Sequence, residues 1–219
     1  NPKLYDVAFK VGNDIVKSYF GMRKFSWVTD SKGFKRMGLN NKPYFHTGLL
    51  DQGYWSDGML TPPSNAALEW DVKMVKSMGF NMLRKHIKIE PLRWYYHCDK
   101  EGILVWQDMV SGGTKYNLLY IGLLATVFEY HIKDDNESGY KKLARADKEG
   151  RDEFENELRV TMNHLKNVVS LAVWVPFNEG WGQFDSVRIT KEMKKIDPTR
   201  LIDSVSGWND QGKGTSDTK

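Results

Sequence analysis

The first 25 residues alternate between apolar and polar positions in a way that predicts β structure. Val7–Val11 and Ile15–Phe20 are apolar-rich runs on either side of a short Gly-Asn-Asp stretch, which is typical of a hairpin. A second hairpin is predicted around Asn40 and Asn41, two residues that tolerate left-handed backbone. Because two hairpins cannot bury a face by themselves, we expect this part of the chain to be the end of a larger β domain.

From Lys42 onward the pattern changes to strands that alternate with helices. The helices are recognised by apolar residues at helical spacing, such as Leu68, Val72, Val75 and Met78. Ser64 or Asn65 can cap the first of them and Asp185 the last. The strands are short apolar runs between these helices. The predicted helices cover 65–78, 91–101, 154–165 and 185–196, and the predicted strands cover 44–50, 80–87, 103–106, 168–177 and 201–205.

This alternation fits two architectures, a doubly wound sheet and a (β/α)8 barrel. A Gly-x-Gly-x-x-Gly or phosphate-loop pattern follows none of the strands, which weakens the nucleotide-binding sheet. In both architectures the functional side chains lie at the carboxyl ends of the strands. The residues expected there include several tryptophans mixed with amides and carboxylates, among them Trp106, Trp174, Trp181 and Trp208. Flat rings beside hydrogen-bonding groups suit a sugar, so we predict a carbohydrate site.

The pair Asn178-Glu179 closes the most apolar strand. A carboxyl group placed between Trp174 and Trp181 is expected to be partly desolvated and to hold a proton near neutral pH. A general acid in glycoside cleavage needs that property, and Asn178 could donate to a sugar hydroxyl. The alternative is that the pair arose by chance and caps the next helix. Its position among tryptophans favours function.

The stretch from Val173 to Gln183 resembles the acid/base motif of glycoside hydrolase family 2, the β-galactosidase, β-glucuronidase and β-mannosidase group. Other segments agree in order: Tyr19–Arg23, Asn41–Pro43, Gly79–Arg84 and Trp94–Val105. The resemblance implies an incomplete (β/α)8 TIM-type barrel with about five of eight strands, preceded by the end of an immunoglobulin-like sandwich. It predicts terminal sandwich strands over 1–26, a connecting hairpin over 27–43 and the first part of the catalytic barrel over 44–219.

The resemblance implies a retaining hydrolase of terminal β-linked sugars, β-galactosidase-like, with Glu179 as acid/base. Together with the tryptophans at the predicted rim, this gives a set of candidate substrate contacts, and neither a metal nor another cofactor is expected. The set is Asn178, Arg84, Asp108, Trp106, Trp174, Trp181 and Trp208. Two positions depart from the family's pattern. Ile87 stands where many β-galactosidases carry a histidine, and Asp108 stands where many relatives have a glutamate. Specificity for galactose is therefore left open.

A retaining glycosidase needs two carboxyl groups about 5–5.5 Å apart. In family 2 the second is a glutamate on strand seven, and the five predicted strands stop before it. Asp108, Asp210 and Glu90 also lie at the predicted rim, but binding or ion pairing suits them better. We therefore expect these 219 residues to be part of a longer enzyme and to show no turnover by themselves. The alternative function is a carbohydrate-binding barrel without hydrolysis.

Composition excludes some partners and leaves others open. The net charge of +4 (32 − 28) is spread along the chain, which gives no argument for nucleic acid. The longest apolar run is shorter than the roughly 20 residues that a membrane span needs. The single cysteine, Cys98, excludes an internal disulfide and a cysteine-based zinc site. Oligomeric state and compartment stay open.

One connection, Met109–Ala146, is unusually long, and such loops are mostly functional or disordered. Gly112 and Gly113 could act as its hinge. The apolar stretch from Leu118 to Phe128 could then lie over the pocket, or form a helix packed outside the barrel.

Overall fold

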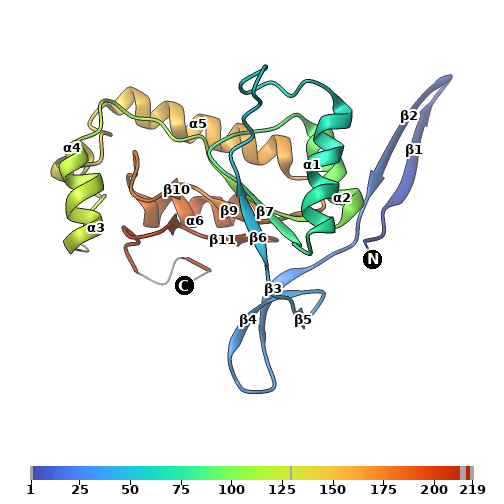
Figure 1. Ribbon diagram of the computed structural model, residues 1–219, viewed down its shortest axis with the longest axis horizontal. Coiled ribbons are helices and arrows are strands. Elements are labelled where there is room, and N and C mark those ends of the chain that lie inside the picture. Colours follow the sequence, from blue (N-terminus) through green and yellow to red (C-terminus); the bar gives the residue numbers. More distant parts are fainter. Residues whose placement is uncertain (1, 129, 213–215, 218–219) are drawn as a thin grey trace. The chain divides into compact units, whose positions relative to one another are not determined.

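The computed structural model describes residues 2–128, 130–212 and 216–217. The chain divides into two compact units. The first unit comprises Asn1–Arg84, Glu90–Val105 and Asn167–Ala172, and the second unit comprises Lys85–Ile89, Trp106–Lys166 and Val173–Lys219. Figure 1 labels the helices and strands. The predicted boundaries at residues 26 and 43 stay predictions.

The antiparallel strands at the N-terminus belong to the first unit. β1 (Tyr5–Val11) and β2 (Asp14–Phe20) form the predicted hairpin (Figure 1). A separate three-stranded sheet consists of β3 (Phe25–Thr29), β4 (Lys35–Leu39) and β5 (Lys42–Pro43). Asn40 and Asn41 turn the chain between β4 and β5 with φ angles of 52° and 65°, as predicted. The pattern did not predict β3.

A five-stranded parallel sheet follows, in the order β11-β9-β8-β7-β6. Four of its strands are shorter than predicted, whereas β8 extends two residues beyond the predicted end at Trp106. β9 ends at Val175, because the next residue, Pro176, has no N–H to donate to the hydrogen-bond ladder of the sheet. Beyond it a short parallel pair forms between β10 (Phe177–Asn178) and β12 (Val205–Ser206). The five strands are β6 (Gly48–Asp51), β7 (Met82–Lys85), β8 (Leu104–Asp108), β9 (Leu171–Val175) and β11 (Leu201–Ile202).

Two helices of the first unit begin and end at the predicted signals. α1 (Asn65–Ser77) is capped by the Ser64 side chain, which accepts from the Ala67 N–H at 3.0 Å. α2 (Leu92–Glu101) begins after Pro91 and ends at Gly102, whose φ of 72° is the left-handed conformation common at helix ends. The inward stripe of α1 was predicted one residue too far, because Met78 lies beyond the last helical turn and is 54% exposed.

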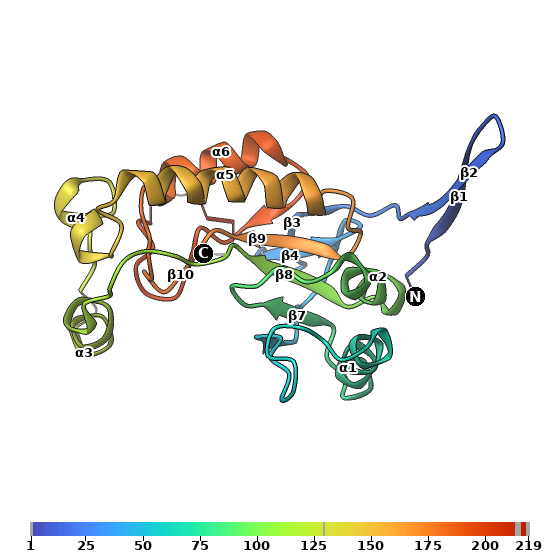
Figure 2. The same ribbon diagram turned by 90° about the horizontal axis from the view of Figure 1, so that it is seen from above.

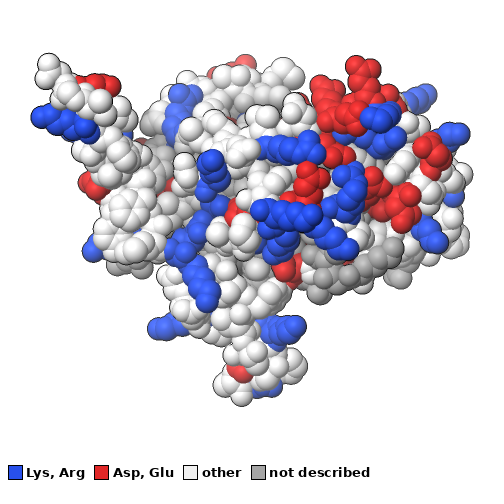
Figure 3. All heavy atoms as spheres, turned by 180° about the vertical axis from the view of Figure 1, so that it is seen from behind, with Lys and Arg blue, Asp and Glu red and all other residues white. Residues whose placement is uncertain are grey.

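The helices of the second unit cover its core on one side. α5 (Lys148–Leu165) and α6 (Ser186–Ile196) lie side by side (Figures 1 and 2). The apolar stripe of α5 is buried as predicted, while Ile196 at the end of α6 is 38% exposed. Acidic and basic side chains lie intermixed on the face seen in Figure 3. Arg159 of α5 and Arg188 of α6 both form ion pairs with Glu155. Exposed pairs of this kind contribute about 0–1 kcal/mol each.

Asp185 occupies the predicted N-cap position of α6 with a left-handed φ of 43°, but its side chain does not cap the helix. Instead, the Asp134 carboxylate accepts from the Ser186 N–H at 3.0 Å. The Asp185 carboxylate accepts from the Tyr140 hydroxyl at 2.7 Å. A residue 52 positions upstream thus satisfies the first amide of α6.

The long connection forms short helical turns: a π-helical turn at Leu119–Leu124, α3 (Ala125–Phe128) and α4 (Glu137–Lys142). Ile121 is buried. Leu118, Leu123 and Phe128 are more than half exposed, so these side chains do not cover a pocket in this structure. No helix in residues 2–128, 130–212 and 216–217 is long and apolar enough to cross a membrane.

Candidate active site

Glu179 stands on a strained turn directly after β10. Its φ of 50° is in the left-handed region, which is unusual for a residue with a side chain and occurs often at functional sites. The Glu179 N–H donates to the Ser206 carbonyl at 2.8 Å, and the Trp181 N–H donates to the Asn178 carbonyl at 3.0 Å. The first bond holds the turn against the end of β12, and the second closes the turn itself.

Glycines in both loops bring the side chains close together. A Cβ at Gly207, whose φ is 90°, would lie 2.9 Å from Cγ of Glu179. A Cβ at Gly180 would lie 2.9 Å from Cζ2 of Trp208. The Glu179 side chain therefore passes over Gly207, and the Trp208 ring packs on Gly180. The turn after β10 and the loop after β12 thus pack against each other at these two glycines.

Trp181 receives its support from the long connection. Its ring makes an edge contact with Tyr116, with the ring centroids 4.8 Å apart. The Tyr116 hydroxyl donates to the Gly112 carbonyl at 2.8 Å, and burial raises the pKa of that hydroxyl. Tyr116 was not singled out from the sequence, because the residues around it show no helical or strand period that would place it.

Asn178 is half-buried beside Glu179, and its side-chain oxygen accepts from the Ser206 hydroxyl at 2.9 Å. Ser206 thus bonds both members of the pair, one through its side chain and one through its backbone. This arrangement fixes the orientation of the Asn178 amide.

Trp174 was predicted to contact substrate, and the structure places it in the core instead. The side chain is 0% exposed, and its indole N–H donates to the Asp197 carboxylate at 2.9 Å. Arg200 bonds the same carboxylate at 2.7 Å. Side chains alternate along a strand, so Trp174 points away from the face that carries its neighbours. We assign it to packing.

The other predicted residues occupy different environments. Asp108 is 1% exposed and Glu90 is 3% exposed, so both carboxyl groups are buried in their own units. Asp210 is half-buried and accepts from the Gly212 N–H at 3.0 Å. Trp106 is half-buried on β8 in the second unit, and Arg84 is half-buried on β7 in the first unit. Asn178, Glu179, Trp181 and Trp208 are the predicted site residues that the described contacts bring together.

The predicted desolvation of Glu179 is not found in this chain. Its side chain is exposed, although tryptophans flank it. The expectation assumed that both Trp174 and Trp181 would cover the carboxyl group. Since Trp174 lies in the core, that cover is missing from the described residues.

Behind the exposed side chains lies a buried polar cluster centred on Gln183, which is 0% exposed. The Gln183 amide donates to the Asp134 carboxylate at 2.7 Å and to the Asn209 carbonyl at 3.0 Å. Asn209 in turn accepts from the Ile132 N–H at 2.8 Å. The cluster joins the long connection to the loops after β10 and β12. Residues of this cluster that bond to one another lie far apart in the sequence, so no local pattern could have predicted these pairs.

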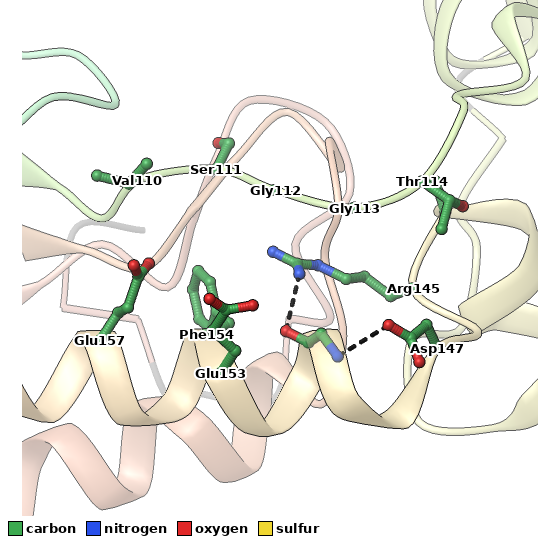
Figure 4. A pocket seen from close by; sticks show the side chains of 12 residues that line it. Val110, Ser111, Gly112, Gly113, Thr114, Arg145, Asp147, Glu153, Phe154 and Glu157 are labelled. Atoms are coloured by element: carbon green, nitrogen blue, oxygen red, sulfur yellow. Dashed lines mark hydrogen bonds between the residues drawn. The ribbon is translucent and has the colours of Figure 1, made fainter.

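The second unit also contains a cavity of about 340 Å³ between the start of the long connection and α5 (Figure 4). Arg145, Phe154 and Glu157 lie in its wall. Among the described residues, no group of three or more His, Cys, Asp or Glu side chains could hold a metal ion.

The TIM barrel domain of glycosyl hydrolases family 2 matches residues 33–216. The chain belongs to this family. The strand and helix order and the five-stranded parallel sheet are those of an incomplete family 2 barrel domain, and antiparallel strands precede this sheet at the N-terminus. The predicted family and fold class are thereby confirmed, and the chain is assigned to a family of glycosidases.

Two curated proteins are similar to this chain in sequence. A putative β-glucuronidase of Formosa agariphila is 26% identical over 218 residues, which is 94% of this chain and 18% of the relative. An exo-β-D-glucosaminidase of Amycolatopsis orientalis is 30% identical over 122 residues, which is 50% of this chain and 11% of the relative. The chain thus spans less than a fifth of the length of either relative.

A solved family 2 structure shows the same fold. The β-D-glucuronidase of Dictyoglomus thermophilum superposes with a TM-score of 0.67 at 19% identity, over 92% of this chain and 32% of that one. The predicted specificity for galactosides finds no support among these three proteins, since their names refer to glucuronic acid and glucosamine.

Proposed function

We propose that the protein containing this chain hydrolyses terminal β-linked sugars with retention, and that Glu179 is its general acid and base. The supporting observation is the position of Glu179. It directly follows β10 and is hydrogen-bonded to Ser206 of β12, in the turn that carries Trp181 and packs on Trp208 through Gly180. In (β/α)8 barrels the catalytic groups lie at the carboxyl ends of the strands, and the position of Glu179 directly after β10 supports the proposal on that ground.

In the proposed reaction the Glu179 carboxyl group gives its proton to the glycosidic oxygen while the bond from that oxygen to the anomeric carbon breaks. A second carboxylate, outside these 219 residues in this proposal, attacks the anomeric carbon and forms a glycosyl-enzyme ester. Glu179, now ionised, takes a proton from a water molecule, and the resulting hydroxide displaces the ester. The free sugar and the original carboxylate are released.

Trp181 and Trp208 are proposed to bind the apolar face of the sugar, and Asn178 to donate to a ring hydroxyl. The bond from the Ser206 hydroxyl to the Asn178 side-chain oxygen supports this role, because it fixes the orientation of the amide beside Glu179. The sugar is proposed to be a β-linked uronic acid or aminosugar, in line with the names of the curated relatives. A galactoside is kept as the third sugar to test.

The test uses the full-length protein that contains this chain. Hydrolysis of β-glucuronides, β-glucosaminides and β-galactosides is measured with two leaving groups each, an activated nitrophenol and an unactivated alcohol. Glu179→Gln is expected to lower kcat/KM about 10²–10⁴-fold for the unactivated series, because the leaving alcohol needs a proton. The nitrophenyl series needs little proton transfer and is expected to lose less at the glycosylation step.

Glu149→Gln is the matched control, because it makes the same chemical change at an exposed residue at the start of α5. Its kinetics are expected to equal those of the unmodified protein. Equal and small losses for Glu179→Gln on both series would remove Glu179 from the mechanism. Sugar binding without any turnover of the full-length protein would support the non-catalytic alternative.

A further inference from the structure

Arg145 is a buried cation whose hydrogen bonds run to backbone carbonyls in two different segments. It follows α4 and is 4% exposed. Its Nε donates to the Gly182 carbonyl at 2.7 Å, and its Nη1 donates to the Gly150 carbonyl in the first turn of α5 at 3.1 Å (Figure 4). Burying a guanidinium costs free energy unless its N–H groups are hydrogen-bonded, so the bonds to these two carbonyls fix the position of the Arg145 side chain.

Aromatic rings surround the same guanidinium. Its Cζ lies 5.0 Å from the ring centroid of Phe154 and 5.5 Å from that of Phe184. These two rings pack with Phe177, whose centroid is 5.2 Å from that of Phe154. Cation–π contacts of this kind are worth roughly 0.5–2 kcal/mol and suit the planar arginine head better than lysine. Phe177 belongs to β10, two residues before Glu179. Burial lowers the pKa of Arg145, while Tyr116 and Glu157 oppose that shift.

The bond to Gly182 fixes the turn that carries Glu179 and Trp181. Gly182 has a left-handed φ of 66°, and a Cβ there would lie 2.0 Å from the Gly112 carbonyl oxygen. The turn is therefore pressed against the start of the long connection. Gly112 also accepts from Tyr116, whose ring supports Trp181. Arg145 is thus hydrogen-bonded to a turn that meets the long connection at both Trp181 and Gly182.

We propose that Arg145 is a positioning residue: it holds residues 180–183 in place through the Gly182 carbonyl and so sets the position of the acid Glu179. The proposal rests on the proposed function of Glu179. A purely packing role would need the aromatic contacts alone. The single 2.7 Å bond to the carbonyl three residues after Glu179 adds a direct link to the acid's own turn.

The experiment compares three variants of the full-length protein with the same pairs of substrates. Arg145→Met keeps the length and apolar contact of the side chain but removes all its donors. Arg145→Lys keeps the charge and one donor group but loses the fork. Arg159→Met is the matched control, because Arg159 lies exposed on α5 and makes only surface ion pairs.

Arg145→Met is expected to lower kcat/KM about 10–100-fold for unactivated substrates, since a misplacement of about 1 Å can cost about 100-fold. The loss on nitrophenyl substrates is expected to be about threefold or less. In Arg145→Lys the loss of kcat/KM on unactivated substrates is expected to be smaller than in Arg145→Met, so that the two substrate series differ less. Added to Glu179→Gln, Arg145→Met is expected to cause no further loss that depends on the leaving group, because the acid is already gone.

Hydrogen exchange of the backbone provides a readout that does not depend on activity. Peptides covering 178–184 are expected to exchange at least about tenfold faster in Arg145→Met than in the unmodified protein. Peptides from the middle of α6 are expected to be unchanged. If the Met variant does not fold, the Lys variant decides the question by the same two measurements.

Equal losses on both substrate series, together with unchanged exchange at 178–184, would overturn the proposal. A leaving-group effect in Glu179→Gln with none in Arg145→Met would overturn it as well and leave the function of Glu179 intact. If Glu179→Gln itself shows no leaving-group effect, the proposed function fails. The exchange measurement then still shows whether Arg145 holds the turn.

Discussion

Replacing Trp174 by Phe tests whether this tryptophan belongs to the core or to the site. The change removes the indole N–H that donates to Asp197 at 2.9 Å and leaves the ring position apolar. Asp197 also bonds Thr199 and Arg200. Although burial alone would raise the pKa of Asp197, the hydrogen bonds from Thr199, Trp174 and Arg200 and the Arg200 charge lower it to about 2.

The expected loss of stability follows from these contacts. A hydrogen bond to a charged group is worth roughly 1.5–3 kcal/mol. The smaller Phe ring leaves space in a fully buried position, which adds about 1 kcal/mol. We therefore expect the free energy of unfolding to fall by about 2.5–4 kcal/mol at pH 7.

The effect should depend on pH in one direction. A carboxyl group with a lowered pKa stabilises the fold above its unfolded value of about 3.9, and this contribution disappears as the pH falls toward 2. Because Trp174 stabilises the ionised form of Asp197, the difference between variant and unmodified chain is expected to shrink over that pH range.

Urea unfolding of the 219-residue chain, followed by circular dichroism, measures the difference. Trp70→Phe is the control, since the Trp70 ring is 60% exposed on α1 and its replacement is expected to cost less than about 0.5 kcal/mol. A Trp174→Phe chain as stable as the unmodified one, or a full-length variant of normal stability that has lost sugar binding, would refute the assignment of Trp174 to the core.

Two further substitutions test how the loops are held. Gly182→Ala is expected to lower the melting temperature by about 5 °C or more, because a left-handed alanine costs roughly 1–2 kcal/mol and its Cβ would press on the Gly112 carbonyl. The control is Gly122→Ala, which has open space around the added Cβ and should change the melting temperature little. Equal melting temperatures of the two variants would contradict the packing described. Asp134→Ala is expected to cost about 2–4 kcal/mol in urea unfolding, because Gln183 and Ser186 each lose a buried acceptor. The exposed Asp135→Ala is its control, and a loss no larger than that of the control would show that the buried cluster does not stabilise the unit.

The order and type of most elements could be predicted from local pattern. Helical spacing placed α1, α2, α5 and α6, and Ser64 and Gly102 marked helix ends, because capping involves residues only a few positions apart. The strand that ends near Glu179 was recognised because buried parallel strands are continuously apolar. The Asn178-Glu179 pair, read in that setting, was sufficient to suggest the family that the comparison then confirmed.

The sequence by itself thus determined the family, the alternation of strands and helices and the position of Glu179 at a strand end. Tertiary structure decided which side chains meet there. Trp174 and Trp181 are alike in sequence, yet one bonds Asp197 in the core and the other rests on Tyr116. Asp134 caps α6 and Arg145 bonds Gly182 from 52 and 37 positions away. Such pairs form when the folded backbone brings distant segments within hydrogen-bonding range. Local periodicity predicts helices and strands but not which distant residues will meet.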